Sequence, residues 1–93
     1  MSSKMQNIKD VLKAELIGKE AAIVDAKNRA NIGIKGKIID ETKSTFTIRT
    51  SEGQKKVIKE NITIEVVHHN QKVRIKGKLL ATAPEERIKI KVK

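Results

Sequence analysis

The sequence predicts a mainly β protein, a small antiparallel barrel of about six strands with a short N-terminal helix. Apolar and polar residues alternate over most of the chain, which is typical of strands with one buried face. Turn-forming residues separate these segments at short intervals. The 93 residues are enough for one modest core, so we expect a single domain. It comprises an N-terminal segment and helix at 1–18, a barrel at 19–80 and a basic C-terminal segment at 81–93.

The first expected element is an amphipathic helix over residues 8–17. Apolar residues recur there at three- and four-residue spacing, and Gly18 is suited to the position just past its end. A helix of about ten residues is too short to persist alone in water, so its apolar stripe must pack on the domain or on a partner.

The first expected strand covers residues 19–26 and has apolar residues on both faces. This pattern fits either a barrel wall that the helix covers or a sheet edge that receives another protein. We therefore predict a protein-contact surface in the N-terminal part of the chain, with intramolecular packing as the alternative. Its candidate residues are Leu12, Leu16, Ile23 and Val24.

Residues 31–50 predict a β-hairpin. Ile32, Ile34 and Ile38 share one face of an extended strand with Gly36, and the two intervening lysines point the other way. A polar turn and a β-branched second strand follow. A glycine in the middle of a strand indicates a bend or a close approach of two backbones, as a small curled barrel requires.

Three further strands are expected at residues 54–58, 62–67 and 72–79, with a single helical or tight turn at 59–61. The last strand alternates strictly, which places its apolar residues, Leu79 included, inside and four cations outside. We expect one helical turn at 84–87 and then an extended or frayed basic end.

The charge is strongly basic and unevenly distributed. The chain has 21 Lys and Arg against 11 Asp and Glu, and the whole net charge of +10 follows residue 26, because four lysines and four acids cancel before it. A Lys-rich proteome would explain the amount of charge but not its position, so we predict one surface for a polyanion. We expect RNA contacts from these residues: Lys27, Arg29, Lys35, Lys37, Lys72, Arg74, Lys76, Lys78, Arg87, Lys89 and Lys91.

Catalytic and metal-binding patterns are weak in this sequence. The Asp40-Glu41 pair would face opposite sides of a strand, so we assign it to a turn rather than to a metal site. His68 and His69 would also diverge if extended, and the chain has no cysteine. The single aromatic residue, Phe46, excludes base stacking on rows of aromatic side chains. We therefore expect no catalytic residues, no bound metal and no bound cofactor.

Four motifs occur in order: ELIG at 15–18, GIKGKIIDET at 33–42, RIKG at 74–77 and PEERIK at 84–89. None is specific alone. Together they make the chain resemble the archaeal ribonuclease P protein component 1 family, relatives of the eukaryotic 29-kilodalton subunit. Ala83 is a departure, since an arginine often precedes the PEERIK proline in relatives.

The resemblance implies an Sm-like β-barrel and a non-catalytic, RNA-binding subunit of ribonuclease P, which removes 5′ leaders from precursor tRNA. It implies that the ribonuclease P RNA carries out the reaction, for which magnesium is expected. It further implies a zinc-ribbon protein subunit and other ribonuclease P proteins as partners, with precursor tRNA as the substrate of the complex.

Three other functions stay open at this point. A ribosomal protein with a small basic barrel would share the size and charge, and an Sm-type ring would bind uridine-rich RNA. An enzyme in its own right is disfavoured, because no catalytic groups converge. We expect a cytoplasmic location, since the sequence has neither a secretory signal nor an apolar run of membrane-spanning length.

Overall fold

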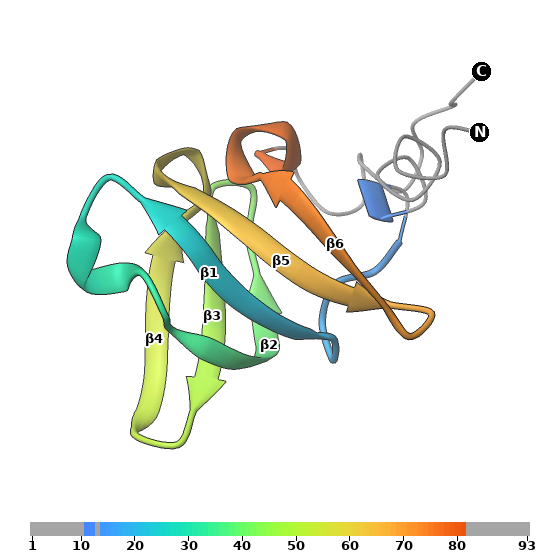
Figure 1. Cartoon of the computed structure of the whole chain (residues 1–93), viewed down its shortest axis with the longest axis horizontal. Coiled ribbons are helices and arrows are strands. Elements are labelled where there is room, and N and C mark those ends of the chain that lie inside the picture. Colours follow the sequence, from blue (N-terminus) through green and yellow to red (C-terminus); the bar gives the residue numbers. More distant parts are fainter. Residues whose placement is uncertain (1–10, 13, 82–93) are drawn as a thin grey trace.

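The computed structural model of the protein describes residues 11–12 and 14–81. They contain six antiparallel strands in one sheet, with the order β4-β3-β2-β1-β5-β6 (Figure 1). The strands are β1 (Glu20–Ala26), β2 (Lys35–Glu41), β3 (Thr45–Thr50), β4 (Gly53–Ile58), β5 (Ile62–His68) and β6 (Gln71–Lys76). Two 3₁₀ turns lie between strands, η1 (Arg29–Asn31) and η2 (Lys59–Asn61), and a third, η3 (Gly77–Leu80), follows β6. The prediction of a mainly β fold with six antiparallel strands is confirmed.

The sheet curls over itself without closing. Figure 1 shows β1, β5 and β6 crossing in front of β2, β3 and β4, so one sheet supplies two layers. β4 and β6 are the outer strands of the hydrogen-bonded order, and no pairing joins them within residues 11–12 and 14–81. The predicted closure into a barrel is therefore not confirmed.

The core lies between the two layers. It is built from aliphatic residues that alternate along the strands, such as Ile62, Ile64 and Val66 of β5, together with the fully buried Phe46 of β3. In β6, Val73 and Ile75 point inward as the alternation predicts. Burial of these side chains is the main favourable contribution to folding.

The close approach predicted at Gly36 is confirmed. A Cβ atom at this position would lie only 1.8 Å from the backbone oxygen of Arg49 on β3. Only glycine lets the two backbones approach this closely. β2 can therefore leave β1, which it pairs at its beginning, and continue along β3.

The N-terminal helix is shorter than predicted in the part that the structure describes. Val11 and Leu12 have helical backbone geometry, but residues 14–17 do not, so the prediction is wrong at this end. Positions 8–10 and 13 lie outside the described residues. Val11 and Leu16 are fully buried in the core, which means that the apolar stripe packs on the domain itself.

β2 begins later than predicted. The Asn28 side chain accepts a hydrogen bond of 3.0 Å from the backbone nitrogen of Ala30, which caps η1 and holds this segment in a turn. Ile32 consequently lies outside the sheet and is 44% exposed, and Ile34 is only partly buried. The prediction that Ile32 belongs to the inner face of a strand is wrong, whereas Ile34, just before β2, packs against the core.

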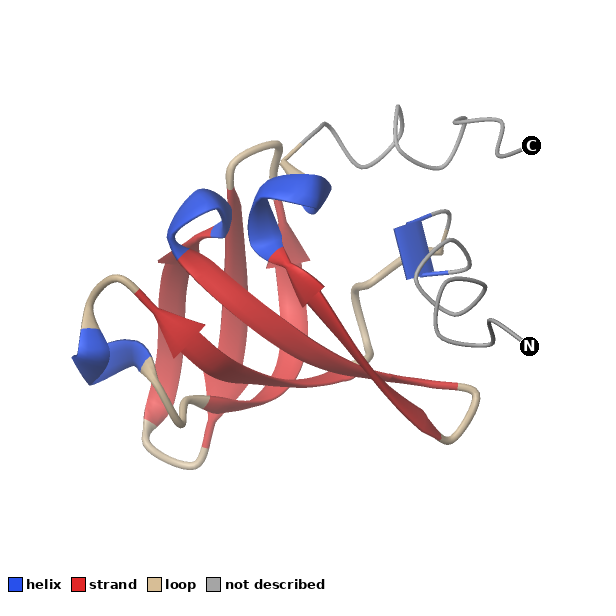
Figure 2. Ribbon diagram, turned by 45° about the horizontal axis from the view of Figure 1, so that its top comes forward, coloured by secondary structure: helices blue, strands red, loops and turns tan. Residues whose placement is uncertain are grey.

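The last strand ends earlier than predicted, because Gly77 turns the chain into η3. A Cβ atom on Gly77 would lie 2.0 Å from the backbone oxygen of Lys59, so η3 packs directly against η2. Figure 2 shows these two turns side by side at one end of the sheet. Leu80 therefore enters the core, and Leu79, predicted inside, is 52% exposed. The turn and basic end predicted at 84–93 lie outside the described residues.

Candidate nucleic-acid interface

The predicted RNA-binding cations that the structure describes are all exposed. They are Lys27, Arg29, Lys35, Lys37, Lys72, Arg74, Lys76 and Lys78. Arg87, Lys89 and Lys91 lie outside the described residues. The eight described cations lie just after β1, in η1, at the start of β2, on the outer face of β6 and in η3.

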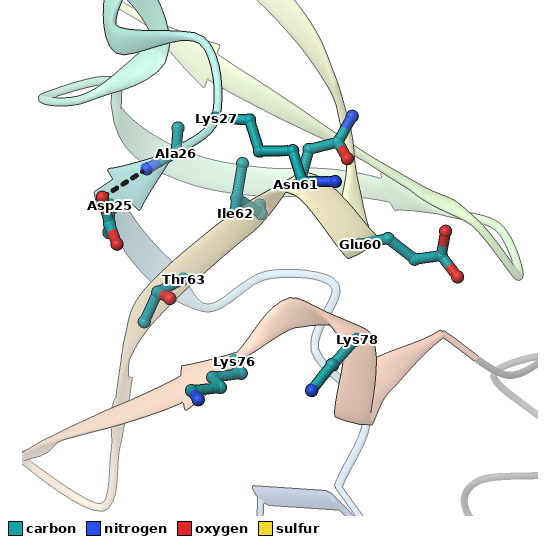
Figure 3. Close-up of a pocket in the computed structure, with 9 residues that line it drawn as sticks. All are labelled: Asp25, Ala26, Lys27, Glu60, Asn61, Ile62, Thr63, Lys76 and Lys78. Atoms are coloured by element: carbon teal, nitrogen blue, oxygen red, sulfur yellow. Dashed lines mark hydrogen bonds between the residues drawn. The ribbon is translucent and has the colours of Figure 1, made fainter.

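Three of these lysines line one pocket of about 280 Å³, with Lys76 and Lys78 on one side and Lys27 on the other (Figure 3). It lies where β1 ends, β5 begins and β6 passes into η3. We call it the lysine pocket. Its lining residues are Asp25, Ala26, Lys27, Glu60, Asn61, Ile62, Thr63, Lys76 and Lys78.

Backbone contacts fix the positions from which the three lysines extend. The backbone nitrogen of Lys27 donates to the oxygen of Asn61 at 2.9 Å, which ties the exit of β1 to η2. Lys76 is the last residue of β6 and lies opposite Thr63 on β5. Lys78 follows Gly77, whose close packing on η2 brings η3 to the pocket.

The charges of the pocket favour an anion. Asp25 accepts a hydrogen bond of 3.0 Å from the backbone nitrogen of Ala26, and Figure 3 shows Glu60 extending away from Lys76 and Lys78. None of the three lysines forms an ion pair with another described residue. Exposed ammonium groups of this kind bind phosphate as point charges.

The cations on the outer face of the sheet do not form the continuous patch that we predicted. Directly opposite residues share a face, and the pairing places Arg74, Glu65, Ala22 and Lys35 in one row across β6, β5, β1 and β2. Arg74 Nη2 lies 3.3 Å from Glu65 Oε2. Glu65 thus interrupts the basic surface, and Arg74 has a local partner of opposite charge.

A buried ion pair, which was not predicted from the sequence, lies next to the lysine pocket and includes Lys59 of η2. Lys59 Nζ lies 2.7 Å from Glu41 Oε2, and both side chains are almost completely buried. The same amine donates to the backbone oxygen of Leu80 at 2.8 Å and lies 4.8 Å from the centre of the Phe46 ring. The pair therefore fastens η2 to the end of β2 and to η3. The turn assignment of Glu41 is wrong.

The other acidic and histidine candidates do not form a metal site within the described residues. Asp40 is exposed and Glu41 buried, as neighbours in a strand should be. His68 is buried and His69 exposed, but their rings lie 4.1 Å apart because His69, at φ 50°, belongs to the β5–β6 turn, so the prediction that they diverge is wrong. Within the described residues, no three His, Cys, Asp or Glu side chains are grouped to hold a metal. That same part of the chain has no helix long and apolar enough to cross a membrane.

The predicted protein-contact residues divide into two groups. Leu16 and Ile23 are buried in the core, which favours intramolecular packing for them. Leu12 is partly buried against the same core, and Val24 is half-buried. β1 pairs with both β2 and β5, so the interpretation of this strand as a sheet edge is wrong.

Comparison with known proteins identifies the family. The sequence model of ribonuclease P/MRP subunit p29 matches residues 9–90. The chain belongs to the p29 family. Ribonuclease P protein component 1 of Methanocaldococcus jannaschii is 45% identical over 85 residues, which is 90% of each chain. The protein of the same name from Archaeoglobus fulgidus is 36% identical over 89 residues, covering 96% of this chain and 86% of the relative.

A solved structure agrees with this assignment. It is described as that of Mth11, a homologue of the human RNase P protein Rpp29, and it aligns with a TM-score of 0.58 at 33% identity. The alignment covers 80% of this chain and 97% of that one. The resemblance found from the sequence motifs is thus confirmed.

Two motifs of this p29-family chain have a clear structural basis. Gly36 of GIKGKIIDET and Gly77 of RIKG occupy the two places where backbones approach too closely for a side chain. Lys76 of RIKG lines the lysine pocket. The motifs therefore shape the sheet and position the cations at its end.

Proposed function

We propose that this chain is a non-catalytic, RNA-binding subunit of ribonuclease P that assists the RNA subunit in removing 5′ leaders from precursor tRNA. The observation that carries the proposal is the lysine pocket, which three exposed lysines from separate segments line without ion pairs to other described residues. Such groups neutralise the phosphates of a folded RNA. The family assignment points to the ribonuclease P RNA and sets aside the ribosomal and Sm-ring alternatives.

Recognition through this surface depends on phosphates, ribose hydroxyls and RNA shape. Phe46, the single aromatic residue of the chain, is fully buried and offers no face for a base. Lysines carry little sequence information when they contact phosphates. The proposed subunit therefore positions a folded RNA rather than reading a long single strand.

In this proposal, the reaction belongs to the RNA subunit and its magnesium ions, and the chain binds no cofactor of its own. Precursor tRNA is the substrate of the whole complex. A zinc-ribbon protein subunit and other ribonuclease P proteins are the proposed protein partners, in the cytoplasm. Val24, half-buried on β1, is the candidate contact for a protein partner that is least committed to the core.

Crosslinking the protein to RNA in its native cells, followed by sequencing of the attached RNA, tests this proposal. We expect enrichment of the ribonuclease P RNA. A variant with Lys27, Lys76 and Lys78 changed to Gln should lose most of that signal. The matched control changes three other exposed lysines, Lys43, Lys55 and Lys56, to Gln and should keep it. Enrichment of ribosomal RNA alone would contradict the proposal.

A further inference from the structure

A second hollow of about 470 Å³ lies on the outer face of the sheet, further along the strands that form the lysine pocket. It runs across β6, β5, β1 and β2, because Lys72 and Val67 line it at one side and Lys35 at the other. Its volume falls in the range of small-ligand sites, about 300–1,000 Å³. We call it the carboxylate groove, after Glu20 and Glu65 in its lining.

The groove has an uncharged floor between two cations. Ala22 is half-buried and Val67 is 37% exposed, so both present apolar surface. Lys72 lies opposite Val67, and Lys35 lies opposite Ala22. Lys72 and Lys35 lie on strands three intervals apart and in rows two residues apart, so at the usual strand spacing their backbones are about 16 Å apart. Two long lysine side chains can reach inward over that span.

Two carboxylates flank this floor, and each has a cation beside it. Glu65 lies opposite Ala22 and is held by Arg74 at 3.3 Å, and Glu20 lies opposite Lys37. Carboxylates accept hydrogen bonds and repel phosphate. The centre of the groove therefore suits a neutral, flat group with N–H donors, while its ends suit phosphates.

We propose that the carboxylate groove binds one unpaired guanine nucleotide of the RNA. Guanine offers adjacent N–H donors on its Watson–Crick edge, which a carboxylate can accept, and its face can cover Ala22 and Val67. The phosphates on either side of that nucleotide then contact Lys35 and Lys72. Uracil presents two carbonyl oxygens and one N–H group, so the carboxylates disfavour it. This inference rests on the proposed RNA-binding function and adds direct readout of a base to it.

The test uses the full chain and four RNA hairpins that differ only in a single bulged nucleotide, G, A, C or U. Affinity is measured by fluorescence anisotropy for the wild type and for the combined Glu20→Gln and Glu65→Gln variant. A bidentate contact to a base discriminates by about 1–3 kcal/mol, so we expect the wild type to bind the bulged-G hairpin at least about tenfold more tightly than the bulged-U hairpin. The variant should lose this preference and still bind the bulged-U hairpin.

The other outcomes distinguish a failure of the guanine site from a failure of the proposed RNA-binding function. Equal, salt-sensitive binding of all four hairpins would overturn the guanine site and leave RNA binding intact. A preference that survives in the variant would show that another surface reads the base, which also overturns it. If the variant changes no RNA affinity but weakens binding to another ribonuclease P protein, the groove is a protein contact and the inference is wrong. Binding to none of the hairpins, and none to ribonuclease P RNA, would contradict the proposed function itself.

Discussion

Lysines occupy two opposite environments in this chain. Lys59 is completely buried, with its amine bound to Glu41 and to the backbone of Leu80. Lys76 and Lys78, at the neighbouring pocket, are exposed and make no ion pair with other described residues. A buried charge must be paired because its desolvation is costly, whereas an exposed ammonium group stays hydrated and can exchange water for phosphate.

The comparison separates the lysine that stabilises the fold from those that we propose to contact RNA. Lys59 joins η2 to η3, and these two turns carry Glu60, Asn61 and Lys78 to the pocket. The buried Lys59–Glu41 pair thus helps to fix the positions of the cations at the pocket. Substitution of Lys59 should therefore mainly lower stability, whereas substitution of the exposed lysines should mainly lower RNA affinity.

The largest expected effect follows from breaking the interior pair. Lys59→Met leaves the Glu41 carboxylate buried without its partner amine, which should lower the free energy of unfolding by about 3–5 kcal/mol. Chemical denaturation measures this change. Lys56→Met, the same substitution at an exposed position of β4, is the control and should change it by less than about 0.5 kcal/mol. Equal stability of the two variants would contradict a structural role for Lys59.

Substitution of the exposed lysines should lower RNA affinity and leave stability nearly unchanged. Changing Lys27, Lys76 and Lys78 to Gln removes three phosphate contacts, which corresponds to about a hundredfold loss of affinity for ribonuclease P RNA in about 150 mM salt. The free energy of unfolding should change little, because these side chains are exposed. Anisotropy titration and denaturation of the same sample measure both quantities. A large loss of stability would show that these lysines are structural.

An intermediate effect on stability and on RNA binding is expected at Gly77, where η3 packs against η2. Gly77→Ala forces a Cβ atom against the Lys59 backbone oxygen, and overpacking of this kind costs about 1–3 kcal/mol. The shift of η3 should also displace Lys78 and weaken RNA binding. Thermal unfolding and RNA titration test both effects. Unchanged values in both measurements would mean that η3 does not depend on this packing.

The smallest effect is expected at Arg74. Its partner Glu65 already compensates its charge, and the Arg74 side chain is 64% exposed. Arg74→Gln should therefore change the free energy of unfolding by less than about 1 kcal/mol. It should also weaken RNA binding less than Lys76→Gln does in the same titration. An effect larger than that of Lys76→Gln would place Arg74, rather than the lysine pocket, at the centre of RNA binding.

Regular alternation made much of the fold predictable. The β-branched second strand of the predicted hairpin is β3, and η2 was predicted as a single turn. The inward residues of β5 followed from the period of two, which one buried face imposes. The pairing partners of β1 did not follow, because alternation does not say which strands become neighbours.

Long-range contacts account for the errors. Nothing near Lys59 in the sequence marks it as buried, since Glu41 and Leu80 reach it only after folding. Gly77 was read as part of a strand, because its contact with Lys59 joins distant segments. For the same reason Leu79, predicted inside, is exposed, and Leu80, for which nothing was predicted, is the residue that enters the core. The cations of the pocket were all named from the sequence, but their meeting at one place depends on these contacts.

The salt dependence of RNA affinity tests the central claim most directly. If about six of the eight exposed candidate cations each neutralise one phosphate, the affinity of the wild type for ribonuclease P RNA should fall about a thousandfold between 50 and 200 mM salt. The slope of log affinity against log salt should be shallower by about 2–3 units in the variant of Lys27, Lys76 and Lys78. The matched variant of Lys43, Lys55 and Lys56, which loses the same charge, should keep nearly the wild-type slope. Equal slopes in the two variants would contradict a specific role for the lysine pocket.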